Sequence, residues 1–237
     1  MKLNYISADS RGEVDHGWLK SAHTYSFGHY HDENRMGFGA LRVVNDDSID
    51  GGQGFGKHAH NNMEIVSIGL EGQISHGDNM GNKTLINAGE IQAMTAGTGV
   101  IHSEMNASAS ESAKFFQIWI ETRDRNIRPA YSQKKFEKSE RVNKWQLVVA
   151  PDTATEDVVK IYQDAWIYLG DFVAGRKAIY SLKDGTKNGV FLMVIEGEVT
   201  VGEQVLMRRD AVEITEVTDL EIEIGKDARL LLMEVPL

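Results

Sequence analysis

The sequence predicts an all-β protein built from two stacked β-barrel units. Glycine is abundant at 23 residues and proline is scarce at 3, while short β-branched and aromatic runs alternate with Gly, Asn and Asp turns. Such runs between turn residues are typical of all-β chains. The length of 237 residues exceeds the roughly 100–150 residues of a common single domain. It therefore favours two compact units, although one fused double barrel also fits.

The apolar runs predict the individual strands. In chain order, the expected strands are 39–44, 63–70, 90–94, 115–121, 145–150, 160–169, 177–182, 190–196, 198–201, 211–215, 220–224 and 230–235. Each run is short, is rich in Val, Ile, Leu or aromatic residues and ends at a turn residue, as strands do. Few helices are expected.

An internal repeat supports the two units. When residues 63–94 are placed on residues 190–215, LEGQISH matches IEGEVTV and AGEIQAM matches RDAVEIT. Each copy predicts a strand, a Glu-Gly turn, a second strand, a turn and a third strand. We expect a metal-binding unit at 1–125, a polar linker at 126–140 and a second unit at 141–237. All eight histidines lie at or before position 102, so the second unit is expected to lack metal ligands.

Composition narrows the chemistry. The chain has no cysteine, which excludes disulfides, zinc-thiolate sites and thiol nucleophiles. A formal charge of −10 argues against direct binding of nucleic acid. Because the first twenty residues resemble no secretory signal and no apolar run is long enough for a membrane helix, we expect a cytoplasmic protein. We also expect a monomer.

Two short motifs point to a metal. His58 and His60 are two residues apart, as are His102 and Glu104, and on strands this spacing places each pair on one face. Two such strands facing each other aim three imidazoles and a carboxylate at one point, a set suited to a divalent metal. The alternative is a surface histidine pair and an unrelated salt-bridged pair.

The flanking sequence resembles the cupin motifs. Gly52, His58, His60 and Glu64 follow the spacing of the first motif, while Gly99 and His102 follow a looser version of the second. Longer segments of the chain resemble a more specific group, the pirin family, and especially its bacterial members with quercetinase activity. These segments are HGWLKSAHTYSFGHY, MGFGALRVVNDD, HAHNNMEIV, LEGQISHGDNMGNK, MTAGTGVIHSE and FQIWI. The resemblance implies a bicupin fold of two jelly-roll domains.

The resemblance also implies the ligands. It assigns His58, His60, His102 and Glu104 to one divalent metal per chain, with Fe(II) favoured over Ni, Co, Cu, Mn or Zn. In many cupins the first-motif carboxylate coordinates instead. Here that residue is Glu64, which we expect next to the site or as a substitute ligand.

Other residues are candidates for the surroundings of the metal. Phe55, Met63, Phe116 and Trp119 are candidates for an aromatic pocket, with ordinary core packing as the alternative. Gln117 is polar within the apolar run FFQIWI and needs a partner if buried.

Three histidines remain outside the ligand set. His29 and His31 are expected in a solvated loop. For His76 we expect a structural hydrogen bond rather than ligation.

Two functions follow from the resemblance. The first is a dioxygenase that uses dioxygen to open the central ring of flavonols such as quercetin and releases carbon monoxide, with Glu104 accepting the flavonol proton. The alternative is a metal-binding regulatory protein that acts through contacts with a protein partner. A metal-bound scaffold without catalysis is a third, simpler alternative.

Overall fold

Strands form almost the whole chain. This computed structural model describes residues 1–237, apart from the side chain of residue 186. Among the described residues the helical elements are three short 3₁₀ turns: η1 (Ala8–Ser10), η2 (Lys138–Arg141) and η3 (Gly185–Lys187). None of the described helical segments is long and apolar enough to cross a membrane. The all-β prediction is therefore confirmed.

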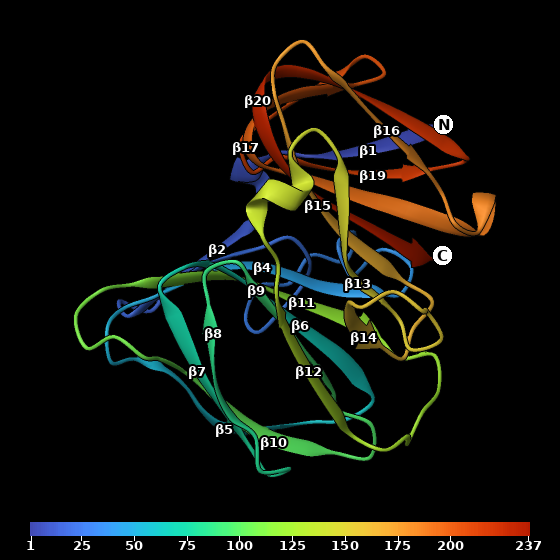
Figure 1. Ribbon diagram of the computed structural model, residues 1–237. Helices are drawn as coiled ribbons and strands as arrows, with labels where there is room; N and C mark the ends of the chain where they lie inside the picture. Colours follow the sequence, from blue (N-terminus) through green and yellow to red (C-terminus); the bar gives the residue numbers. More distant parts are fainter.

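Two sheets face each other in the first unit, which lies at the bottom of Figure 1. The larger sheet has the order β12 (Ala130–Lys135), β9 (Glu90–Thr95), β6 (Met63–Glu71), β11 (Ala113–Glu121), β4 (Leu41–Ile49), β3 (Leu19–His23) and β2 (Gly12–Asp15). The smaller sheet has the order β5 (Gly54–His60), β10 (Val100–Asn106), β7 (Gln73–Asp78) and β8 (Lys83–Asn87). All pairings within these two sheets are antiparallel.

One nine-stranded sheet forms the second unit. Its order is β1 (Lys2–Ile6), β19 (Ala211–Thr215), β17 (Asn188–Val201), β20 (Asp219–Pro236), β15 (Trp166–Phe172), β13 (Trp145–Pro151) and β14 (Val159–Ile161). In addition, β16 (Lys177–Ser181) pairs with β20 and β18 (Gln204–Met207) pairs with β17. The interior of this unit is a cluster of buried apolar side chains, including Leu192, Ile222 and Leu232.

The strand pairing differs from the predicted division into two units at two places. Residues 2–6, expected in the first unit, form β1 and pair with β19 of the second. The expected linker at 126–140 contains β12, which pairs with β9 and extends the large sheet of the first unit. Neither segment has an apolar run, so backbone pairing with a neighbouring strand decides their placement.

The predicted repeat is present in the pairing. Strand β6 pairs with β9 and β7 pairs with β8, just as β17 pairs with β19 and β18. Gly72 and Gly197 of the two Glu-Gly turns both have positive φ, the conformation that favours glycine. In the second copy the two strands are joined into the single bulged strand β17. The separate strands expected at 220–224 and 230–235 are likewise one strand, β20, and the strand expected at 160–169 is split between β14 and β15.

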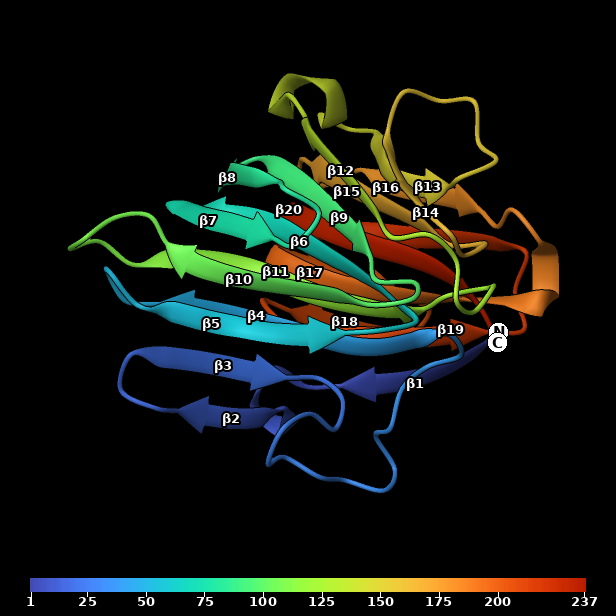
Figure 2. The ribbon, with the colours of Figure 1, turned by 90° about the horizontal axis from the view of Figure 1, so that it is seen from below.

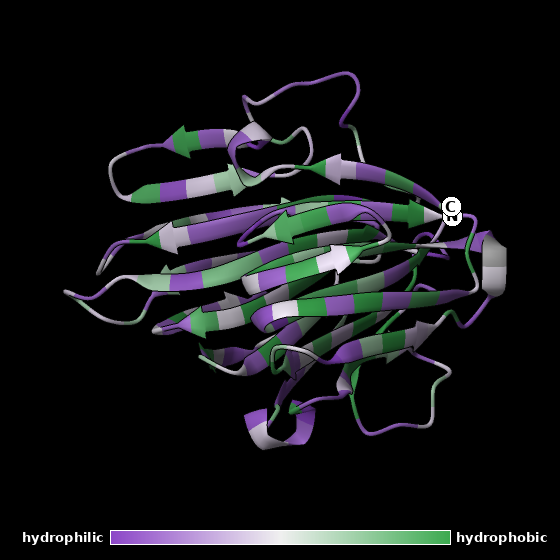
Figure 3. Cartoon of the chain, turned by 90° about the horizontal axis from the view of Figure 1, so that it is seen from above, coloured by the Kyte–Doolittle hydropathy of each residue, from purple (hydrophilic) through white to green (hydrophobic). Residues whose placement is uncertain are grey.

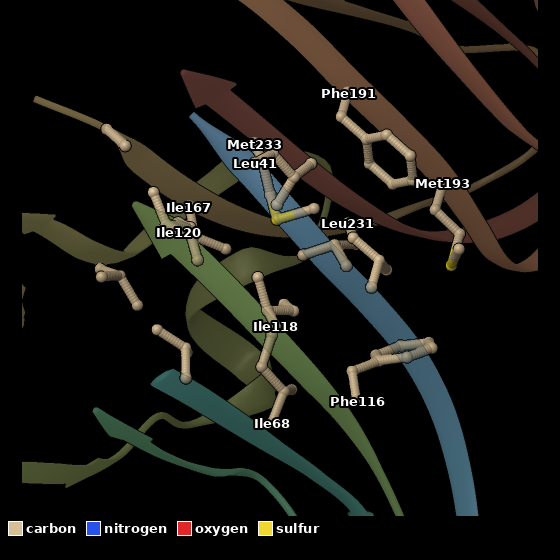
Figure 4. Packing of buried hydrophobic residues seen from close by; sticks show 14 of the residues in the cluster. Leu41, Ile68, Phe116, Ile118, Ile120, Ile167, Phe191, Met193, Leu231 and Met233 are labelled. Atoms are coloured by element: carbon tan, nitrogen blue, oxygen red, sulfur yellow. The ribbon is translucent and has the colours of Figure 1, made fainter. Parts of the chain in front are cut away.

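Alternating side chains give the large sheet of the first unit two different faces. Figure 3 shows hydrophobic and hydrophilic residues alternating along many strands. On β11, Phe116, Ile118 and Ile120 belong to a core shared with the second unit, whereas Gln117 and Trp119 point into the first unit. Figure 4 shows Ile118 and Ile120 opposite Leu231 and Met233 of β20. The two units are thus joined by a common apolar core, and the candidate site lies on the other face of the same sheet.

Candidate metal centre

Three histidines meet between β5 and β10. The two strands are antiparallel neighbours, with His102 opposite His58 and Val100 opposite His60. The ring centroids are 4.4 Å apart for His58 and His102, 4.8 Å for His58 and His60, and 4.9 Å for His60 and His102. One nitrogen from each ring lies within 4.8 Å of the others. The two-residue spacing therefore places the imidazoles together as the strand geometry predicts.

Glu104 lies on the same strand as His102. A bulge between the two residues shifts the pairing of β10 with β5, and Glu104 groups with His102 and His76 within the same 4.8 Å limit. Its buried carboxylate accepts hydrogen bonds from Ser67 Oγ at 3.1 Å and from Gln117 Nε2 at 2.8 Å. Burial raises the pKa of Glu104 to about 7. Gln117 thus has the partner that its buried position requires.

The donor atoms fit a divalent cation. Among the described residues neither ring nitrogen of the buried His102 has a hydrogen-bond partner. His58 Nδ1 is 2.8 Å from the Gly56 carbonyl oxygen, to which it can donate, leaving Nε2 free as a ligand. Burial, followed by the neighbouring imidazoles, lowers the pKa of His102 to about 3 and that of His60 to about 4. Neutral imidazoles beside a buried carboxyl group form a donor set for metals of borderline hardness.

His76 supports this cluster from the next strand. On β7 it is opposite Glu104, and its Nε2 is 3.1 Å from Asp78 Oδ2. Asp78 in turn accepts hydrogen bonds from the side chain and backbone of Asn82. The expected hydrogen bond of His76 is present, while its buried Nδ1 has no hydrogen-bond partner among the described residues and His76 also belongs to the possible metal-binding group with His102 and Glu104.

A cavity of about 460 Å³ opens beside the histidines. Its lining includes Phe55, His58, Glu104, Gln117 and Trp119. The Trp119 ring packs edge-on to His60 at 4.8 Å and to Phe27 at 5.2 Å. Aromatic side chains thus pack against the histidine cluster and line the cavity.

Three predicted neighbours of the metal lie elsewhere. Glu64 is on the opposite face of β6 from Ser67, where it accepts a 2.6 Å hydrogen bond from Thr95 Oγ1. The prediction for Glu64 is wrong because the turn at Asn62 leads from β5 into a strand of the other sheet. Phe116 likewise faces the shared core, with the Arg209 guanidinium 5.2 Å above its ring. Met63 packs against a small apolar cluster of Ile65, Met94 and Val100 and does not line the cavity.

The two loop histidines differ in their position relative to the cavity. Both His29 and His31 are exposed, as expected for a solvated loop, but His29 also contributes to the cavity lining.

One wall of the cavity consists of residues that the sequence did not predict at the site. Ser21, His23, Asn45 and Asp47 all line it and all are buried. The residues Asn45-Asp46-Asp47 follow the predicted strand 39–44 and resemble a turn, whereas β4 continues through them to Ile49. Burial raises the pKa of Asp47 to about 7. Residues 45–48 are all polar, so no alternation of apolar and polar residues in the sequence extends the strand through them.

Comparison with known proteins places the chain in a family. A family model described as Pirin matches residues 6–120, and one described as Quercetinase C-terminal cupin domain matches residues 147–235. The chain is 40% identical over 229 residues to quercetin 2,3-dioxygenase of Escherichia coli K12, covering 97% of this chain and 96% of the relative. The chain belongs to the pirin family.

Other pirin-family relatives agree over the whole length. A pirin-like protein of Caulobacter vibrioides is 37% identical across 95% of this chain and 96% of its own. The solved structure of the bacterial pirin YhhW of Escherichia coli in complex with nickel(II) has a TM-score of 0.92 at 39% identity, with 99% of each chain covered. The two-domain cupin fold implied by the resemblance is therefore confirmed.

Proposed function

We propose that this pirin is a metal-dependent dioxygenase that opens the central ring of flavonols such as quercetin between C2 and C3 and releases carbon monoxide. The observation that carries the proposal is a pair of possible metal-binding groups that share His102, one with His58 and His60 and one with His76 and Glu104, at one side of an aromatic cavity. The relative named quercetin 2,3-dioxygenase supports the substrate class.

His58, His60, His102 and Glu104 are the proposed ligands of one divalent ion. When bound, the metal supplies a Lewis acid for a flavonol oxygen and activates the substrate toward dioxygen. Fe(II) remains our favoured ion, and the nickel(II) complex of the related bacterial pirin supports a divalent metal in this family. Metal content of the protein purified from its native host identifies the ion.

Glu104 is the proposed base. Its carboxylate lines the cavity, and Ser67 and Gln117 orient it through hydrogen bonds. A carboxylate oxygen held in this way accepts the proton of the flavonol 3-hydroxyl, which leaves the substrate as the more electron-rich enolate. The C2–C3 and C3–C4 bonds then break, so that carbon 3 leaves with its oxygen as carbon monoxide. One atom of dioxygen bonds to C2 and the other to C4, and the product is an ester that carries a carboxylic acid.

The aromatic lining holds the flat substrate and limits water. Phe27, Phe55 and Trp119 line the cavity, and Trp119 also packs on His60. Such large apolar rings bind a planar aromatic molecule through stacking and burial.

A turnover assay tests the proposal. We expect metal-loaded protein to consume quercetin, followed by its absorbance, and to release one carbon monoxide per quercetin. The His58→Ala variant should lose turnover and metal together, whereas His31→Ala, which changes an exposed histidine outside the lining, should retain both. Metal binding without turnover would instead support the regulatory alternative.

A further inference from the structure

A small cavity lies between the two units, apart from the cavity beside the histidines. Its volume is about 20 Å³, which is enough for one water molecule or one small ion. The turn η2, which connects β12 to β13, contributes Lys138 and Arg141 to the lining, and β20 contributes Arg229. Figure 2 shows η2 on the side of the molecule opposite β2 and β3. We call this space the junction cavity.

Apolar side chains from both units form most of the remaining lining. Ile68, Leu70 and Ile91 come from β6 and β9 of the first unit, while Leu169 and Ile195 come from β15 and β17 of the second. All of these except Leu70 belong to the core that the two units share. Charges beside such an apolar surface interact more strongly than charges in water.

Two guanidinium groups at the junction cavity share one carboxylate. Arg141 is only 4% exposed, and its Nε donates a 3.0 Å hydrogen bond to Asp171 Oδ2. Arg229 Nε is 3.6 Å from Asp171 Oδ1, and neither of these two atoms has a hydrogen-bond partner among the described residues. Glu196 is opposite Arg229 on the neighbouring strand, yet its carboxylate pairs with Arg208 at 2.9 Å.

Lys138 adds a third positive charge to the lining. The acidic neighbours of Lys138 in the chain do not neutralise it, because Glu137 pairs with Lys135 and Glu140 pairs with Lys144. Three cations and one shared carboxylate leave a formal charge of +2 at the cavity. An uncompensated charge beside apolar surface is costly, and an anion bound among the cations lowers that cost.

We propose that the junction cavity binds one small monovalent anion, with chloride as the ligand. The volume of the cavity suits a single ion and is too small for phosphate or an organic acid. Arg141 and Arg229 are suitable partners, since a guanidinium group offers several N–H donors and no acceptor. The ion links the η2 turn to both units, so it stabilises the folded structure and takes no part in a reaction. The proposal does not depend on the dioxygenase function.

Bromide locates the site in a diffraction experiment. Bromide has the same charge as chloride and a similar size, and it scatters X-rays anomalously at its absorption edge. Crystals of the full chain are soaked in sodium bromide, and an anomalous peak is expected in the junction cavity within hydrogen-bonding distance of Arg141 and Arg229. A junction cavity without such a peak would overturn the proposal.

Thermal unfolding measures the effect of the ion. The Tm is followed by circular dichroism at constant ionic strength while sodium chloride replaces sodium gluconate, whose anion is too large for the cavity. We expect the Tm to rise to a plateau, with a gain of about 3–6 °C at a chloride concentration tenfold above the dissociation constant.

Three variants assign this rise to the junction cavity. Arg229→Gln should abolish the dependence of Tm on chloride, and Lys138→Gln should reduce it. Lys144→Gln is the matched control, because Lys144 lies near the other end of the same turn and pairs with Glu140 outside the cavity. This control should keep the wild-type rise. Lys138 is exposed, so Lys138→Gln provides the test even if Arg229→Gln does not fold.

Two further outcomes would overturn the proposal. Bromide in the cavity without any chloride dependence of the Tm would indicate an adventitious ion only. A chloride-dependent rise of equal size in all three variants would place the effect at another part of the protein.

Discussion

At the scale of single residues, the face of a strand decides which of two carboxyl groups lies beside the histidine cluster. Glu104 and Glu64 are both buried and both follow a histidine at a spacing that preserves strand parity. The hydrogen bonds separate them, because Glu104 bonds with Ser67 and Gln117 in the cavity, whereas Glu64 bonds with Thr95 on the opposite face of β6. Charge and burial alone do not identify a ligand.

These positions predict different results for two matched substitutions. Glu104→Gln should lower metal affinity at least about tenfold and reduce quercetin turnover more strongly, because it removes the carboxylate of the proposed fourth ligand beside three neutral imidazoles. Glu64→Gln should leave metal affinity within about twofold of the wild type, since its carboxyl group does not face the site. Metal titration and turnover of both variants provide the measurement, with circular dichroism as a folding control. Loss of metal from Glu64→Gln alone would assign the fourth ligand to the other carboxylate.

At the scale of elements, tight turns position β5 and β10, the strands that carry the three clustered histidines. Gly97 lies in the turn between β9 and β10 with a φ of +45°, and its carbonyl accepts a hydrogen bond from Asn62, just after His60. A Cβ at this position would lie 2.1 Å from the carbonyl oxygen of Ile127. This glycine therefore allows three segments to meet beside the histidine strands.

Gly97→Ala tests the importance of this turn. The positive φ and the backbone overlap together should lower the free energy of unfolding by at least about 2 kcal/mol. Gly81→Ala is the control, because its φ of +98° is also positive but nothing lies within 4 Å of the added Cβ. It should cost only about 1 kcal/mol. Denaturant unfolding measures both, and equal losses would show that the contact with Ile127 has no effect.

At the scale of the whole molecule, the two units are parts of one folded structure. The large sheet of the first unit packs one face on the second unit and uses the other face for the cavity. Asp46 of β4 pairs with Arg209 of the second unit at 2.7 Å, and Tyr25 donates a 2.7 Å hydrogen bond to Glu213. The second unit thus supports the sheet on which part of the site is built.

A substitution in the second unit should therefore affect the site in the first. Leu231 is fully buried in the shared core, so Leu231→Ala should cost about 2–5 kcal/mol and lower the Tm by roughly 4–20 °C. Far-ultraviolet circular dichroism and release of bound metal should shift together. Val205→Ala, at a position 47% exposed, is the control and should change neither. Metal release at an unchanged temperature in Leu231→Ala would mean that the units unfold independently.

The sequence by itself determined the all-β class, the repeat and the pairing of His58 with His60 and of His102 with Glu104. These features depend on local properties, namely turn residues, apolar runs and the two-residue period of a strand. They also sufficed to indicate the family, which the comparisons confirmed.

Only the tertiary structure decided the rest. It joined β1 to the second unit, added β12 to the first, turned Glu64 and Phe116 away from the cavity and brought Asn45 and Asp47 into its wall. Strand parity divides the side chains of a strand between two faces. Which of these faces lies toward the cavity depends on which distant strands pair and which sheets pack together. Those contacts join residues far apart in the chain, so no local pattern determines them.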